Sequence, residues 1–123
     1  MYIVTKLHYH QKSNILDIYF DDDKHFALSC EFLRTHSPSA EVQNHGAGVK
    51  LVLNKHNVSI SKLEPVGHYA IRLCFDDAHN SGLYSWQYLR TLCVEQAQLW
   101  DKYLQRVQAH KESEHSVPIK FMP

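Results

Sequence analysis

Cysteine is scarce in this chain of 123 residues, and the three cysteines lie far apart. Cys30, Cys74 and Cys93 form no CxxC pair, so the sequence offers neither a disulfide framework nor a thiolate zinc site. Dispersed free cysteines are typical of a reducing compartment. We therefore expect a cytoplasmic protein.

Long apolar runs and an excess of charge are also missing. No apolar stretch approaches the roughly 20 residues that a membrane-spanning helix needs, and the N-terminus lacks the basic and then apolar pattern of a signal peptide. Lysine plus arginine (13) equals aspartate plus glutamate (13), so no net charge attracts nucleic acid or an anionic membrane. We expect neither as a partner, and we look for local binding patches instead.

The length permits one domain with a single core and leaves no room for a second, catalytic domain. After Trp86 no glycine or proline interrupts the chain until Pro118, and apolar residues recur at steps of three and four from Leu89 to Val107. This spacing predicts an amphipathic helix, or two helices with a bend between residues 93 and 96. We assign residues 1–110 to one domain and residues 111–123 to a flexible tail.

The first third of the chain has the alternation of β-strands, over residues 3–9 and 15–20. Polar QKSN (11–14) and DDDK (21–24) predict turns, and HFALS follows the second turn. Ser29 is a predicted N-cap for a short helix over 30–34. Further on, we predict a meander of three strands over 49–53, 58–63 and 69–75, with Pro65 and Gly67 at its second reversal.

One segment occurs twice. ILDIYFDDDKHFALSCEFLR (15–34) is echoed by AIRLCFDDAHNSGLYSWQYLR (70–90), with a strand, FDD, a nearby histidine, a serine and LR in the same order and one extra residue in the second copy. Two copies indicate a repeated unit of strand, hairpin turn, strand and serine-capped helix. The predicted fold is therefore α+β, with a mainly antiparallel sheet packed against helices in two layers.

Several of these motifs carry a family resemblance. FDD-x-H-x-S-G-L-Y-S-W, taken with LRTHSPSAEV (33–42), HG (45–46) and EPVG (64–67), resembles the gamma-butyrobetaine hydroxylase-like N-terminal domain, over about residues 16–100. The resemblance implies an α+β domain of unknown function, often free-standing in bacteria. Relatives form the front domain of carnitine-pathway hydroxylases and a module of some Mrp-type iron–sulfur cluster assembly ATPases.

In the hydroxylases the resemblance implies a structural zinc held by three cysteines and one histidine. Ser37, Ser39 and Val42 stand where the thiolates would be, and only His79 matches a ligand. Hydroxyl and aliphatic groups do not replace thiolates on zinc, so we expect no metal there and keep His79 as a weak candidate for iron or zinc. Ala78 stands where the family commonly has glycine, so a left-handed turn there would be strained.

The residues that remain as a candidate binding surface are, in chain order, His45, Gly46, Asp76, Asp77, His79, Tyr84 and Trp86. The two aspartates and His79 fit a metal or acid–base site, but the repeat favours turn-forming roles. His45 and Gly46 lack the strand and helix that flank a phosphate loop. Tyr84 and Trp86 fit a binding surface or, more commonly for such aromatics, the core.

Two other features have simpler interpretations. His8 and His10 share one face of a predicted strand, but two ligands are too few for a tight metal site. Cys30 lies near a predicted helix start, where thiol pKa values fall, but no histidine and acid accompany it.

Two functions follow from these patterns. The first is a non-catalytic accessory or interaction domain that docks on a partner protein or small ligand. The alternative is a metal-binding protein or an accessory of iron–sulfur cluster assembly, favoured by the ten histidines and by the relatives. We expect no enzyme activity, because the oxygenase domain of the hydroxylases is absent.

Overall fold

Two three-stranded antiparallel sheets and their helices make up the computed structural model, which describes residues 1–43 and 50–115. The first half contains β1 (Val4–His10), β2 (Ile15–Phe20), β3 (His25–Ser29), α1 (Cys30–Thr35) and α2 (Ala40–Gln43). The second half contains β4 (Ile60–Val66), β5 (Ala70–Phe75), β6 (Gly82–Ser85), α3 (Trp86–Val94) and α4 (Gln96–His115). The sheet orders are β1-β2-β3 and β4-β5-β6.

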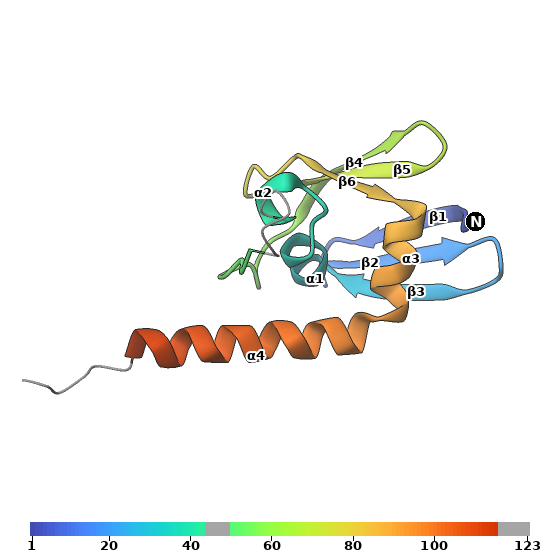
Figure 1. The fold of residues 1–123 in the computed structure, drawn as a ribbon. Helices are drawn as coiled ribbons and strands as arrows, with labels where there is room; N and C mark the ends of the chain where they lie inside the picture. The colour runs from blue at the N-terminus through green and yellow to red at the C-terminus, as the bar shows by residue number, and fades with distance from the viewer. Residues whose placement is uncertain (44–49, 116–123) are drawn as a thin grey trace, which may run out of the picture.

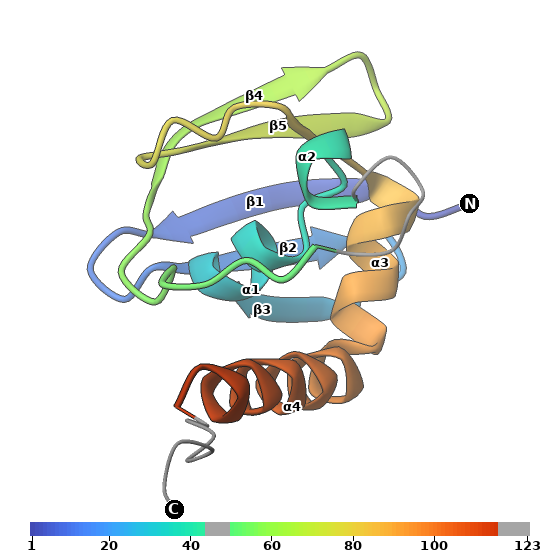
Figure 2. The same ribbon diagram turned by 60° about the vertical axis from the view of Figure 1, so that its left-hand side comes forward.

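One hydrophobic core joins the two sheets to their helices. Helices α1 and α3 lie on the same side of the sheets (Figures 1 and 2). Their buried faces meet the inward side chains of both sheets, and the fully buried members include Leu16, Ile18, Leu28, Phe32, Leu33, Leu73 and Leu89. The predicted α+β class with helices packed on antiparallel sheets is confirmed.

The internal repeat is confirmed and is longer than the sequence showed. The unit β1-β2-β3-α1 corresponds to β4-β5-β6-α3, so each copy begins one strand earlier than the sequence echo. The edge strands share an irregularity, because the register shifts between Val4 and Lys6 in one copy and between Ile60 and Lys62 in the other. The irregularity lies at matching positions, so the two copies agree in the detailed backbone geometry of their edge strands as well as in the order of their elements.

The predicted serine caps are both present. The Ser29 hydroxyl accepts a hydrogen bond from the Phe32 amide, and the Ser85 hydroxyl accepts one from the Tyr88 amide, each at 3.0 Å. The two serines also have nearly the same backbone angles, φ −75° and ψ 154° against φ −69° and ψ 157°. Each cap satisfies an amide at the start of its helix that has no partner within the helix.

The acidic turns match in the same way. Asp23 and Ala78 occupy equivalent places after Phe20 and Phe75, and both have left-handed backbone, with φ of 65° and 67°. The amide of each donates back to the phenylalanine carbonyl, at 3.3 and 3.2 Å. Aspartate tolerates this conformation better than alanine does, so the second copy carries the strain that the sequence predicted.

The predicted meander needs correction. Residues 50–53 form no strand, and the third strand of the second sheet is β6, which follows β5. Tertiary hydrogen bonds replace a strand ladder here, because the Val52 carbonyl accepts from the Tyr103 hydroxyl and the Lys50 amide donates to Val42. Pro65 lies within the edge strand β4, where a missing amide costs little, and Gly67 alone supplies the left-handed residue of the reversal.

The helical C-terminal part breaks where the spacing predicted. Helix α3 ends at Val94, and α4 starts at Gln96 after Glu95 caps α3. Helix α4 continues through residues 111–115, which we had assigned to a tail, and residues 116–123 lie outside the described residues. In the described ranges, no helix is long and apolar enough to cross a membrane.

The strained turn generates a prediction about stability. Replacing Ala78 by glycine should raise the free energy of unfolding by about 0.5 to 1 kcal/mol, because relief of the left-handed strain exceeds the entropy cost of glycine. Urea denaturation at neutral pH measures the change. Asp23→Gly is the matched control and should gain less, and a destabilised Ala78→Gly protein would show that the turn is not strained.

Candidate functional site

The two acidic turns bind the helices of the opposite repeat. Asp77, in the second turn, accepts a hydrogen bond from Nε of Arg34 at 2.8 Å, and Asp22, in the first turn, accepts from Nη1 and Nη2 of Arg90 at 3.1 and 2.9 Å. Both arginines belong to the repeated LR motif, and both are buried. The FDD and LR motifs are therefore paired crosswise between the repeats.

Asp77 lies in the more heavily charged of the two corners. Its carboxylate also contacts Nζ of Lys55 at 2.6 Å and accepts from the amide of His79 at 3.2 Å. Burial raises the pKa of Asp77, but the hydrogen bonds from Lys55 and Arg34 outweigh it and lower the pKa to about 2. Two cations therefore keep the Asp77 carboxylate ionised at neutral pH. Its role is structural, and it does not act as an acid or a base.

The two arginines differ in their surroundings. The guanidinium of Arg90 lies over the rings of Tyr2, Phe20 and Phe26, at 4.5, 4.7 and 5.3 Å. Ile18 of the first sheet is equivalent to Leu73 of the second. Ile18 pairs with Phe26 on the neighbouring strand, whereas Leu73 pairs with Gly82, so Gly82 is the counterpart of Phe26. The second repeat thus lacks an aromatic ring where the first has one.

The space left by that glycine is occupied by Ser37. A Cβ on Gly82 would lie 2.7 Å from the Ser37 hydroxyl, so only glycine fits without displacing this loop. The Ser37 hydroxyl is fully buried and lies 2.9 Å from Nε2 of His79. Beside it, the Ser39 and Ser81 hydroxyls share a hydrogen bond of 2.7 Å.

These contacts bring together residues that the sequence marked as matching a zinc site. Ser37, Ser39, Val42 and His79 are all buried, and Ser37 contacts His79 directly. The set contains one imidazole, two neutral hydroxyls and one aliphatic side chain, and hydroxyls are poor ligands for zinc without the charge of a thiolate. With these side chains, Ser37 and His79 form a hydrogen-bonded serine–histidine cluster.

A cationic pocket adjoins the Asp77 corner. It has a volume of about 280 Å³ and is lined by Arg34, Lys50 and Lys55 together with Val42, Leu51, Val52 and Leu53. Nη1 of Arg34 is buried and makes no hydrogen bond within the described part of the chain, and Lys50 forms no ion pair there. Among the side chains that the structure describes, Asp77 is the carboxylate paired with these cations, so the described lining of the pocket has an excess of positive charge.

The other predicted surface residues do not gather into one patch. Tyr84 is fully buried, and its hydroxyl donates to the Leu33 carbonyl in the core. Trp86 is half-buried, and its indole donates to the His68 carbonyl at 2.8 Å. Asp76 accepts from the Ser59 amide at 3.0 Å and helps to fix β4.

His45 and Gly46, which we also placed on the candidate surface, lie outside the described residues. Of the seven predicted residues, Asp77 and His79 are joined by a hydrogen bond within the second acidic turn, which also contains Asp76.

The cysteines contribute no reactive thiolate. All three are buried, and burial raises the pKa of each thiol, to about 12 for Cys93. A thiol with a raised pKa is a weak nucleophile at neutral pH.

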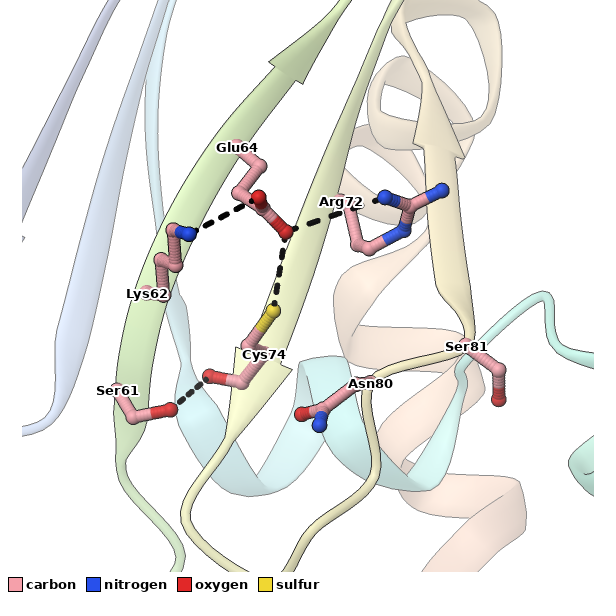
Figure 3. A pocket seen from close by; sticks show the side chains of 7 residues that line it. All are labelled: Ser61, Lys62, Glu64, Arg72, Cys74, Asn80 and Ser81. Carbon is pink, nitrogen blue, oxygen red and sulfur yellow. Dashed lines mark hydrogen bonds and ion pairs between the residues drawn. The ribbon is translucent and has the colours of Figure 1, made fainter.

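A shallow polar hollow lies on the outer face of the second sheet (Figure 3). It is lined by Ser61, Lys62, Glu64, Arg72, Cys74, Asn80 and Ser81, and its volume is about 750 Å³. Figure 3 shows Glu64 at its centre, where the carboxylate meets Lys62 at 3.1 Å, Arg72 at 3.9 Å and the Cys74 thiol at 3.5 Å. The charges of the hollow are satisfied mainly by one another.

The sequence did not mark Lys50 or Lys55 as site residues. Both lie in a stretch that we had predicted as a strand and a turn, and lysines are common in turns and on surfaces. Arg34 carried a signal, because LR is repeated, but its partner is in the other copy and 43 residues away. Only the crosswise packing of the repeats brings these groups together.

A sequence profile of the family described as gamma-butyrobetaine hydroxylase-like, N-terminal, matches residues 7–90. No curated protein matches the chain. Two proteins with NMR solution structures are 49% and 41% identical to it, with TM-scores of 0.80 and 0.79. The first match covers 90% of this chain and 83% of that protein, and the second covers 100% and 99%.

A crystal structure from Acidithiobacillus ferrooxidans is also similar. That protein is of unknown function, belongs to the DUF971 family and is 32% identical, with a TM-score of 0.62. The match covers 72% of this chain and 90% of that one.

The Asp77 corner predicts how stability depends on pH. Because its folded pKa of about 2 is below the ordinary value of 3.8, the ionised carboxylate contributes stability above pH 4 that is lost as the pH falls toward 2. The difference amounts to about 2 kcal/mol. Urea denaturation between pH 7 and pH 2.5 should show this loss, and Asp77→Asn should remove about that much stability at pH 7 and flatten the pH dependence.

Asp22→Asn is the matched variant for this prediction. The Asp22 carboxylate is 42% exposed, against 19% for Asp77, so solvent screens its pair with Arg90 and the cost should be smaller. Equal losses in the two variants would contradict the special role of the Asp77 corner.

Proposed function

Because this chain belongs to the family of gamma-butyrobetaine hydroxylase-like N-terminal domains, we propose that it is a non-catalytic accessory domain that binds an anionic group of its partner in the cationic pocket. The anionic group is a carboxylate or phosphate, carried by a small molecule or by a partner protein. The observation that carries the proposal is the clustering of Arg34, Lys50 and Lys55 around one pocket, with Asp77 as the carboxylate that pairs with two of them.

The absence of catalysis is part of the proposal. In the described ranges, the titratable groups of the acidic turn are held in ion pairs and backbone hydrogen bonds, and the repeated serines cap helices. Groups already bound in this way are not available to move protons or attack a substrate.

The charge of the pocket selects an anion. Arginine presents planar donors that match carboxylate and phosphate oxygens, and a buried guanidinium nitrogen without a partner has lost its hydration. Lys50 and Lys55 add two ammonium groups, whereas Asp77 supplies one negative charge to the corner. An anion in the pocket would therefore replace a repulsion between cations by charge-assisted hydrogen bonds.

The size of the pocket limits the ligand. About 280 Å³ is near the lower end of ligand pockets, which begin at about 300 Å³, and four aliphatic side chains form part of the wall. A phosphate, a small dicarboxylate or one acidic side chain fits this volume. We keep nucleic acid and membranes outside the proposed partners, and we keep the cytoplasm as the proposed location.

Titration of ¹⁵N-labelled, tag-free protein tests the pocket. We expect inorganic phosphate, succinate or an Asp-rich peptide to shift the amide signals of residues 34, 42 and 50–55, with saturation. Lys50→Gln should weaken the binding about tenfold, by loss of one charge-assisted hydrogen bond. Lys62→Gln, in the polar hollow of the other sheet face, is the matched control and should leave the affinity unchanged.

The three probes separate the sources of the anion. Saturation by phosphate or succinate alone favours a small ligand, and saturation by the peptide alone favours a protein partner. Shifts that do not saturate, or that are the same in Lys50→Gln and in the unaltered protein, would overturn the proposal.

The alternative function, in metal or iron–sulfur chemistry, depends on the Ser37–His79 cluster. We propose that tag-free protein holds no zinc or iron at His79, because thiolates are missing from positions 37, 39 and 42. The triple variant Ser37→Cys, Ser39→Cys, Val42→Cys should bind one zinc more than the unaltered protein, measured by elemental analysis. His79→Ala in that background should lose it, and metal held by the unaltered protein but lost in His79→Ala would favour the alternative.

A further inference from the structure

We propose a second site, independent of the cationic pocket, on the outer face of the first sheet: a surface site for a zinc-like divalent transition ion, formed by His8, His10 and Asp17. The three residues each present one ligand atom within 4.8 Å of the other two. The sequence showed only the two histidines, and Asp17 comes from the neighbouring strand.

Strand register explains the convergence. His8 on β1 is directly paired with Asp17 on β2, and His10, two residues along, lies diagonally opposite the same carboxylate. All three point away from the core, since Leu16, Ile18 and Phe20 alternate with Asp17 and fill the buried face. Helices α1 and α3 pack on that buried face (Figure 2), and on the opposite face the side chains of His10 and His25 are 41% and 48% exposed.

The geometry is close to that of a bound ion. The His8 and His10 rings lie 4.2 Å apart between centroids, and Nε2 of His10 lies 2.6 Å from the Asp17 carboxylate. Around a tetrahedral zinc at about 2.0 Å from each donor, neighbouring donors are about 3.3 Å apart. An ion here takes the place of the hydrogen bond between His10 and Asp17, and the two histidine rings rotate to bring their nitrogens to that spacing, with water in the remaining position.

A third histidine acts as a positioning residue. Nε2 of His25, on β3, lies 3.6 Å from the other oxygen of Asp17, and its ring is stacked on Tyr19 at 4.2 Å. A group that contacts the far oxygen of a ligating carboxylate fixes its orientation. The site therefore draws on all three strands of the first sheet.

The donor set selects the class of metal. Two imidazole nitrogens and one carboxylate suit zinc, nickel and copper, whereas magnesium and calcium prefer oxygen ligands alone. The equivalent positions of the second sheet hold Glu64, Val66 and Arg72 and no pair of histidines, so the site belongs to one repeat only.

Calorimetric titration of tag-free protein with zinc chloride tests the site. We expect saturation at one zinc per chain, and no heat of binding with magnesium chloride. The double variant His8→Ala, His10→Ala should lose the binding. Asp17→Asn and His25→Ala should weaken it, each by about tenfold or more, as substitutions around metal ligands do.

Two controls keep the result decisive. His56→Ala removes an exposed histidine elsewhere and should bind zinc as the unaltered protein does. Amide NMR signals should shift in β1 and β2 on adding zinc and stay in place around His79. Zinc binding that survives in the double variant, shifts centred on residues 75–82, or no saturable binding would each overturn the proposal.

Discussion

The crosswise pairing of acidic turns with arginines is the interaction on which the rest of this structure depends. Each repeat supplies one aspartate and one arginine, and neither pair closes within its own copy, so Asp22 binds Arg90 and Asp77 binds Arg34. A half-buried charge is costly when unpaired. Each sheet and helix unit is therefore specified to fold against the other, and one shared core results rather than two small ones.

The two corners differ in their surroundings, and the proposed anion site lies at the second one. In the first corner the aromatic rings of Tyr2, Phe20 and Phe26 enclose Arg90 and leave little room. In the second, Gly82 replaces a ring, the Ser37 loop enters, and Arg34 borders a pocket with two lysines. The two repeats share one backbone arrangement. The cationic pocket and the serine–histidine cluster lie at the second corner, where the side chains differ from those of the first.

The two proposed sites use opposite chemistry on different parts of the molecule. The pocket near Arg34 has an excess of cations in its described lining and fits an anion, whereas the His8, His10 and Asp17 site offers imidazole nitrogens and a carboxylate to a cation. The zinc ligands that the resemblance placed near His79 are replaced by hydroxyls and a valine. Family membership thus describes the fold, and the side chains of this chain decide its ligands.

Local signals in the sequence determined much of this protein. The pattern of apolar residues predicted β1, β2 and β5, and the serines predicted both helix caps. The FDD turns could be predicted because turn formation depends on adjacent residues. Residues 50–53 were mistaken for a strand, since an apolar run does not reveal whether its backbone bonds go to a ladder or to Tyr103 and Val42. Which aspartate meets which arginine, and that Asp17 joins His8 and His10, depended on contacts between strands and between repeats. Such contacts follow from register and packing over long separations, and no short stretch of sequence encodes them.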